Sequence, residues 1–184
     1  MAMVQSEMER LSNELMSFNA ETRAQALHRV EELARAEEAD ANLMPALILL
    51  LKAPEAEDRR RASWVMAKLA QNKIDAFWPL DVLNGLLRDP DPEVRENGAW
   101  ALGELAGMRI SSQASLTYLS MLLEDPSPSI RGVAAWALGR LAERTDLGCQ
   151  ASLAPLRSLV DDPRPSVSKS AAYALDRLKA IGWE

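Results

Sequence analysis

The sequence contains a single cysteine, Cys149, among its 184 residues. One thiol cannot form an intrachain disulfide, and it cannot build a cysteine-rich zinc site. Such sparing use of cysteine is typical of proteins of the reducing cytoplasm, which is the location that we expect. The loop around Cys149 holds no base that would activate the thiol, so we interpret this residue as incidental.

Histidine is as scarce as cysteine, because His28 is the only one. A Ser-His-Asp triad or a histidine-based metal site would depend on His28, and a packing or surface role for this residue is the favoured interpretation. The chain also lacks a glycine-rich phosphate loop, a GxSxG elbow and an HExxH motif. We therefore expect no catalytic residue, no metal site and no cofactor, and we predict a protein that is not an enzyme.

Long apolar runs are absent as well. The longest lies around residues 47–51, far short of the roughly 18 to 20 residues that a transmembrane helix needs. The N-terminal segment MAMVQSEMER carries acids where a signal peptide would carry a basic head and an apolar block, so we expect no export signal. The formal net charge of −6 argues against a protein built to neutralise phosphates, although it is compatible with a locally basic groove. We expect neither a membrane nor a nucleic acid as partner.

What the chain has in abundance is one repeated motif. The string RENGAWALGELAG returns 36 residues later as RGVAAWALGRLAE. The same frame recurs through the chain and places five residues in one column: His28, Trp64, Trp100, Trp136 and Tyr173. A motif that recurs five times at nearly one period is a structural unit, so the sequence predicts a repeat protein.

Each period divides into two helix-length segments that are separated by a turn. In the third period, Pro90 ends the first helix, Asp91 is placed to cap the second, and Pro92 occupies a position where its missing N–H costs nothing. The last turn keeps its two prolines but loses the capping side chain, which leaves Ser166 as the candidate cap. The predicted helix pairs are 4–17 with 21–36, 42–52 with 57–71, 77–88 with 92–107, 112–124 with 128–143, and 151–161 with 165–181.

Short loops between the pairs require each pair to stack on the previous one. We therefore predict an all-α, right-handed α-solenoid, formed as one domain over residues 1–184. Its five repeats are expected at about 4–36, 42–71, 77–107, 112–143 and 151–181.

The turn and second helix of each repeat resemble the HEAT repeat family, and most closely the short HEAT-like repeats of the phycobilisome lyase type. The residues that carry this resemblance are DPDPEVRENGAWALGELAG and DPSPSIRGVAAWALGRLAE, which are similar to the pattern DPxxxVRxxAAxALGxLG of that family. The resemblance implies an armadillo-type fold and a scaffolding role. It does not imply one activity, because family members range from adaptors to a few enzymes.

A helical wheel separates two faces of the second helix in the third repeat. Val94, Gly98, Ala101, Leu102 and Leu105 share one stripe and are predicted to form the core, with Trp100 and Gly103 on the opposite side. In a HEAT-like stack the second helices line the concave surface, so the column of aromatic residues is expected there. The rings could cover neighbouring small residues such as Gly103 and Gly139, or they could serve as a binding hot spot, and both roles can hold at once.

Charged residues accompany the aromatic column on the same predicted face. Acidic members are Glu32, Glu96 and Glu104, and basic members are Arg60, Arg61, Lys68, Arg140, Lys169 and Arg177. If these positions do not simply form solvated helix faces, their basic excess favours an acidic or C-terminal peptide, or another anionic surface, as partner.

A second column consists of arginines and has a structural interpretation. Its members are Arg23, Arg59, Arg95 and Arg131, and the column ends at Ser168. We predict that these guanidiniums bridge neighbouring turns by pairing with Asp89, Asp125 or Asp162, a bidentate role that lysine would fill poorly.

These observations predict a non-enzymatic scaffold or adaptor that binds a protein or peptide in its concave groove. The expected binding residues are His28, Arg60, Arg61, Trp64, Lys68, Glu96, Trp100, Glu104, Trp136, Arg140, Lys169, Tyr173 and Arg177. Two alternatives stay open: a bilin-lyase-like protein that handles a chromophore, and a HEAT-like DNA glycosylase, since Trp100 and Glu104 lie one helical turn apart as in the concave sites of such enzymes.

Overall fold

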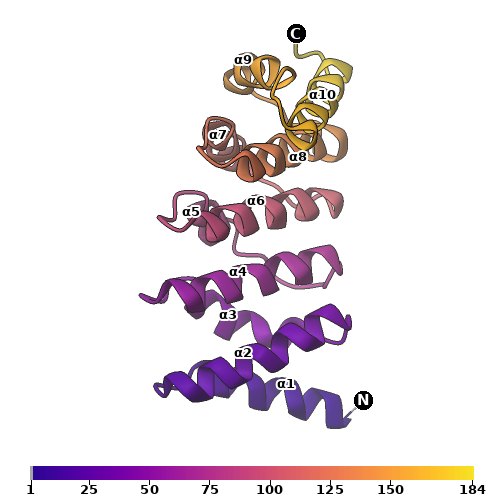
Figure 1. Ribbon diagram of the computed structural model, residues 1–184. Coiled ribbons are helices and arrows are strands. Elements are labelled where there is room, and N and C mark those ends of the chain that lie inside the picture. Colours follow the sequence, from indigo (N-terminus) through magenta and orange to yellow (C-terminus); the bar gives the residue numbers. More distant parts are fainter. Residues whose placement is uncertain (1) are drawn as a thin grey trace.

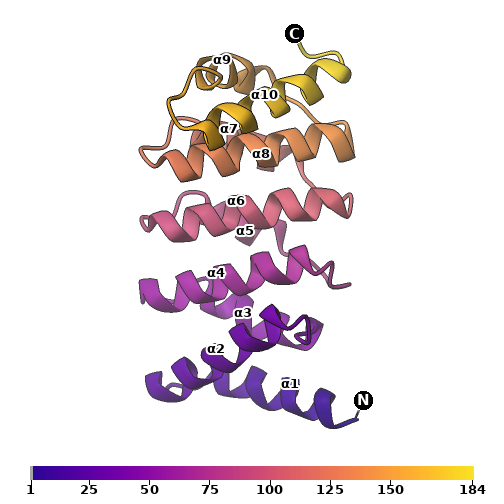
Figure 2. The ribbon, with the colours of Figure 1, turned by 45° about the vertical axis from the view of Figure 1, so that its right-hand side comes forward.

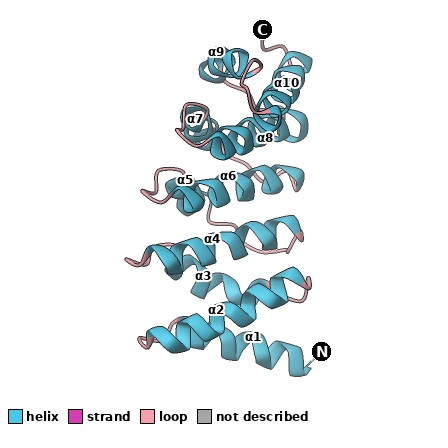
Figure 3. Ribbon diagram, in the orientation of Figure 1, coloured by secondary structure: helices cyan, strands magenta, loops and turns pink. Residues whose placement is uncertain are grey.

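The computed structural model describes residues 2–184, with side chains described from residue 7 onward (Figure 1). All regular structure in this range is helical (Figure 3). The elements are α1 (Ala2–Leu15), α2 (Ala20–Arg35), a 3-10 turn η1 (Ala41–Leu43), α3 (Met44–Leu50), α4 (Ala56–Gln71), α5 (Leu80–Leu86), α6 (Pro92–Gly107), α7 (Gln113–Leu122), α8 (Pro128–Thr145), α9 (Gln150–Leu159) and α10 (Pro165–Ala180).

The helices form antiparallel pairs that stack along the molecule from the N-terminus to the C-terminus (Figure 1). We call α1, α3, α5, α7 and α9 the first helices, and α2, α4, α6, α8 and α10 the second helices. Figure 2 shows the second helices α4, α6, α8 and α10 side by side in one layer, with the first helices behind them. The predicted all-α solenoid of helix pairs is confirmed.

Consecutive second helices make the broadest contacts of the stack, between α4 and α6, α6 and α8, and α8 and α10. The contact between α2 and α4 is distinctly smaller. The core runs through the whole stack as one continuous cluster of leucine, alanine, valine, methionine and isoleucine side chains, together with Trp78. The solvent-accessible side of the second helices, which faces away from the first helices, is named the second-helix face below.

Side-chain caps mark the start of two of the second helices, α2 and α6. The Asn19 side chain accepts hydrogen bonds from the first N–H groups of α2, and the Asp91 side chain does the same for α6. The predicted cap Ser166 is wrong. Helix α10 begins after Arg164 without a side-chain cap, and the preceding turn is closed instead by the Arg164 N–H, which donates to Asp162 Oδ1 at 2.9 Å.

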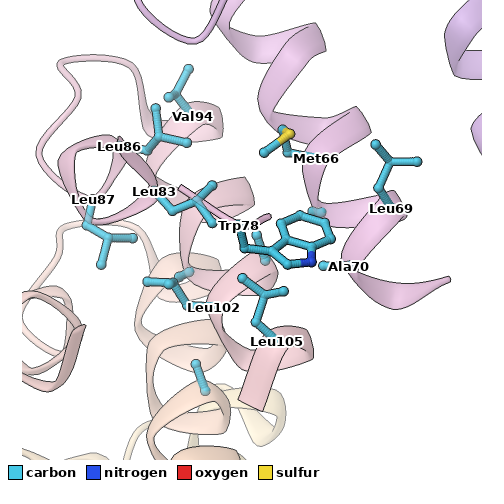
Figure 4. Packing of buried hydrophobic residues seen from close by; sticks show 14 of the residues in the cluster. Met66, Leu69, Ala70, Trp78, Leu83, Leu86, Leu87, Val94, Leu102 and Leu105 are labelled. Atoms are coloured by element: carbon cyan, nitrogen blue, oxygen red, sulfur yellow. The ribbon is translucent and has the colours of Figure 1, made fainter. Parts of the chain in front are cut away.

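The largest departure from the predicted helices is at the start of the third repeat, where α5 covers only Leu80–Leu86 rather than 77–88. Trp78 precedes the helix and is buried. Figure 4 shows its indole lying among Met66 and Ala70 of α4 and Leu105 of α6. The chain therefore gives up a helical turn so that Trp78 can fill the junction between two second helices, which a periodicity argument cannot detect.

The predicted core stripe of α6 is confirmed, because Val94, Gly98, Ala101, Leu102 and Leu105 are all buried. Gly103 lies on the side that the wheel places opposite the core, but it is buried rather than exposed. The ring of Trp136 from α8 covers it so closely that no Cβ atom would fit, which confirms the prediction that the rings cover small residues. A wheel drawn for one helix does not include the side chains of the next helix.

Candidate functional site: the second-helix face

The aromatic column lies on the second-helix face in the register that the sequence predicts. Trp64, Trp100, Trp136 and Tyr173 are half-buried, on α4, α6, α8 and α10 in turn. His28 on α2 differs from them, since 69% of its side chain is exposed, and its Nε2 lies 3.5 Å from the Glu32 carboxylate. The four rings therefore form a continuous column, and His28 extends it only as a surface residue.

Two of the rings pack against the preceding second helix. The ring of Trp136 covers Gly103 of α6, and the ring of Tyr173 covers Gly139 of α8. Glycine permits this close approach because it has no side chain to displace. One side of each ring therefore stabilises the contact between consecutive helices, while the part of the ring that stays exposed contributes to the surface.

Three of the four rings carry an arginine of the chain itself. The guanidinium carbon of Arg140 lies 5.6 Å from the centroid of Trp136, and that of Arg177 lies 5.9 Å from Tyr173. Arg35 reaches from the end of α2 to a position 4.5 Å from the centroid of Trp64. These are cation–π distances.

Trp100 is the exception in the column. Its Nε1–H donates a hydrogen bond of 3.1 Å to Glu104 Oε1, one turn further along α6. Within the described residues, no arginine or lysine lies over its ring as in the other three cases.

A hollow of about 410 Å³ opens beside Trp64, where α2, α4 and α6 meet. Its position coincides with the smaller contact between α2 and α4. The residues that line it are Glu31, Arg35, Glu57, Arg60, Arg61, Trp64, Glu93, Glu96 and Asn97. Of these, the sequence predicts Arg60, Arg61, Trp64 and Glu96 as binding residues, and it misses the others.

Arg60 and Arg61 are engaged in ion pairs within the chain. Arg60 Nη2 lies 2.7 Å from Asp91 Oδ2, and Arg61 Nε lies 2.7 Å from Glu31 Oε1. The hydrogen bond between Arg60 and Asp91 raises the pKa of the guanidinium and lowers the pKa of the carboxyl. Both arginines thus form part of the wall of the hollow, and their positive charges are compensated by Asp91 and Glu31.

The charge of the hollow differs from the basic excess that the sequence predicts. Its lining contains four glutamates and three arginines. The difference arises from Glu31, Glu57, Glu93 and Arg35, whose side chains enter the hollow from three different helices. The second-helix face is therefore not uniformly basic, and the carboxylates of the hollow come from α2, α4 and α6.

The remaining predicted residues lie on the same face but in smaller clusters. Lys68 Nζ donates to Gln71 Oε1 at 2.6 Å, Ser129 donates to Glu96, and Lys169 is exposed on α10. Arg177 pairs with Asp176 and lies 3.8 Å from Glu143.

At the same junction, Tyr173 Oη donates to Glu143 at 3.3 Å. Burial raises the pKa of the Tyr173 phenol, with a further contribution from the neighbouring Glu143 carboxylate. The ring of Tyr173 is thus held in place from its hydroxyl end as well as by Gly139.

The arginine column lies outside this face, at the turns, and its predicted pairing is confirmed. Each guanidinium donates to backbone carbonyls of its own turn and pairs with an aspartate of the next repeat. The pairs are Arg59 with Asp89, Arg95 with Asp125, and Arg131 with Asp162, and Arg23 pairs with Asp58, which the sequence analysis does not predict.

In the described part of the chain, no three side chains of the histidine, cysteine, aspartate and glutamate types gather as a metal ion would require. None of the helices between residues 2 and 184 has the length and apolar character needed to cross a membrane. The Cys149 thiol lies 3.3 Å from the Ser120 hydroxyl, at the contact between α7 and α9.

Comparison with known proteins identifies one matching family model, described as HEAT repeats, over residues 43–139 and 116–181. No curated protein sequence matches the chain. Among solved structures, a designed armadillo repeat protein in complex with the peptide (KR)4 superposes with a TM-score of 0.77 at 22% identity, covering 95% of this chain and 87% of that one.

Two further designed armadillo repeat proteins superpose to a similar extent. One has a TM-score of 0.76 at 21% identity, and the other, computationally designed for modular peptide recognition, has a TM-score of 0.74 at 22% identity. Each alignment covers 95% of this chain and 88% of the other. At such identities the likeness shows a shared fold.

Proposed function

Because the chain belongs to the HEAT repeat family, we propose that it is a non-enzymatic scaffold or adaptor that binds a protein or peptide on its second-helix face. The single observation that carries the proposal is the column of half-buried rings from Trp64 to Tyr173 on that face. Large aromatic side chains on rigid helices provide contact area at a low cost in conformational entropy, which is the usual composition of a binding hot spot.

Two features of the surroundings support this role. The hollow beside Trp64 gives the face a concave feature in which a partner segment could be seated. Designed armadillo repeat proteins that share the fold include one in complex with a peptide and one designed for peptide recognition. A cytoplasmic location is part of the same proposal, on the grounds of cysteine usage.

The preference for an acidic partner, which the sequence suggests, is proposed only for the C-terminal half of the face. There Arg140, Lys169 and Arg177 stand on α8 and α10, with Glu143 and Asp176 as neighbouring acids. Lys169 is exposed, so an acidic stretch of a partner would meet an available cation there.

The proposal can be tested with peptides selected from a random displayed library on the purified protein. We expect Trp136→Leu to weaken the binding of the selected peptides by about tenfold. Leucine can still cover Gly103, but it lacks the exposed part of the hot-spot ring. The matched control is Tyr118→Leu, which changes a half-buried aromatic on the first helix of the same repeat. Circular dichroism and thermal unfolding would verify that both variants are folded.

Two results would contradict the scaffold proposal. One is a library selection that enriches no peptide. The other is equal affinity of the selected peptides for wild type and for Trp64→Leu, Trp100→Leu and Trp136→Leu made one at a time.

Two alternatives keep specific tests. The resemblance of the repeats to the phycobilisome lyase type, together with the aromatic column, favours a chromophore-handling protein as the second candidate, and absorbance of the purified protein beyond the aromatic region would support it. The pair of Trp100 and Glu104 is the basis of the glycosylase alternative. Absence of salt-sensitive DNA binding at low ionic strength would remove that class.

A further inference from the structure

An arginine of the chain lies over each ring of the aromatic column except Trp100. Over Trp136 and Tyr173, the guanidinium belongs to the residue four positions later on the same helix, which lies directly above the ring. Over Trp64 it belongs to Arg35 of the preceding second helix. At Trp100 the residue four positions later is Glu104, so a carboxylate stands where α8 and α10 have a guanidinium.

The surroundings of Trp100 on α6 are correspondingly acidic. Glu93 and Glu96 precede the ring by seven and four residues, and they share its face of the helix. The only cation of α6 is Arg95, which points to the turn and is paired with Asp125 at 2.8 Å. The second-helix face of α6 therefore combines one indole that carries no guanidinium with three carboxylates and no cation of its own.

These carboxylates are compensated unequally within the described residues. Glu104 accepts a hydrogen bond from the Trp100 indole, and Glu96 accepts one from Ser129. Glu93 is exposed, and no ion pair is found for it. Neighbouring Arg60 pairs with Asp91, so the nearby guanidinium is directed to another carboxylate.

From this contrast we infer that Trp100, with Glu96 and Glu104, is a binding position for an arginine side chain of the partner. The inference rests on the proposed function and names the partner chemistry at one repeat. The rings of Trp64, Trp136 and Tyr173 are occupied by the chain's own arginines, so the same column geometry accepts a guanidinium at three equivalent positions. At the fourth position the ring and the carboxylates would be complemented by a guanidinium from outside.

Arginine is favoured over lysine for two reasons. All three internal occupants are arginines. A planar guanidinium can also stack on the indole while its N–H groups point sideways to Glu96 and Glu104, which a compact ammonium group does less well.

The test uses fluorescein-labelled peptides in which four arginines, four lysines or four glutamates alternate with glycine, titrated by fluorescence anisotropy. We expect the arginine peptide to bind more tightly than the lysine peptide. Any binding of the glutamate peptide should involve the cations of α8 and α10 and should not depend on Trp100. The decisive variant is Glu104→Arg, which gives α6 the residue that α8 and α10 have at this position. The new guanidinium should lie over the Trp100 ring and so lower the affinity of the arginine peptide by about tenfold or more.

The control for simple charge attraction is Glu124→Arg, which makes the same charge change at an exposed position after α7. We expect this variant to lower affinity by less than about twofold at 0.15 M salt, because distant exposed charges are screened there. Equal losses in the two variants, or no loss in Glu104→Arg, would overturn the inference, since the peptide would then be held by net charge or elsewhere.

A direct readout comes from the indole N–H signals of the five tryptophans in a ¹⁵N spectrum. The Trp100 signal is assigned from its absence in Trp100→Phe. It should shift on addition of the arginine peptide and stay in place on addition of the glutamate peptide. If library-selected peptides depend on Trp136 but contain no arginine and leave the Trp100 signal unmoved, this inference fails while the proposed function stands. If no peptide is selected at all, the proposed function fails as well.

Discussion

Replacing Arg95 by alanine tests whether the arginine column holds neighbouring repeats together. Arg95 Nε donates to Asp125 at 2.8 Å, and Nη1 donates to the carbonyl of Asp89 at 2.9 Å. Only 17% of the Arg95 side chain and 5% of the Asp125 side chain are exposed, so removal of the guanidinium leaves a nearly buried carboxylate. Breaking a buried ion pair from one side costs about 3–5 kcal/mol.

We expect the lower end of that range, about 3 kcal/mol, because Asp125 Oδ1 keeps a hydrogen bond from the Ser127 N–H at 2.9 Å. For a chain of this length, that loss corresponds to a fall in the melting temperature of roughly 6–12 °C. Urea denaturation followed by circular dichroism would measure it. Arg95→Lys should recover less than half of the loss, because an ammonium group cannot reach Asp125 and the carbonyl together.

The double variant Arg95→Ala with Asp125→Ala provides the internal control. Its cost should be smaller than the sum of the two single costs, because the second change removes the carboxylate that the first one strands. A loss below about 1 kcal/mol for Arg95→Ala, or full stability of Arg95→Lys, would refute the reasoning.

The remaining predictions concern close packing and pH. Gly103→Ala should destabilise the protein by about 1–3 kcal/mol, because the added methyl group meets the ring of Trp136, whereas Gly85→Ala in α5 meets nothing within 4 Å and should be neutral or stabilising by chemical denaturation. A hydrogen bond from Arg131 lowers the pKa of Asp162, so this pair stabilises the fold above the ordinary aspartate pKa of 3.8, and that stability is lost as the pH falls through the lower folded value. Asp162→Asn should therefore flatten the pH dependence of the melting temperature below about pH 4, and an unchanged profile would contradict this assignment.

The sequence predicts the second helices closely because their signals are local. Helix α6 spans the predicted 92–107, since Pro92 and the cap Asp91 determine its start without help from distant residues. The first helix of the same repeat is predicted less well. Helix α5 is shortened by the burial of Trp78 between α4 and α6, and that contact joins segments that the periodic pattern treats separately.

The candidate site also has a part that the sequence predicts and a part that it does not. The column of aromatic residues follows from the period alone, so Trp64, Trp100 and Trp136 are found from the sequence. What touches each ring is decided by the neighbouring helix. Arg35 over Trp64 and the burial of Gly103 both depend on the offset between consecutive second helices, which a wheel of one helix does not contain.

The position beneath each ring also explains why the hollow lies at the first junction. Register places Ala67, Gly103 and Gly139 at the positions that the next ring approaches, and the two glycines are covered by aromatic rings. At the corresponding place in α2 stands the larger residue Glu31, whose Oε1 lies 2.7 Å from Arg61 Nε. Trp64 therefore cannot close on α2 as the later rings close on α6 and α8, and the contact between α2 and α4 is reduced. The repeat pattern thus brings consecutive second helices together where the residue beneath the ring is small, and a hollow remains where that residue is larger.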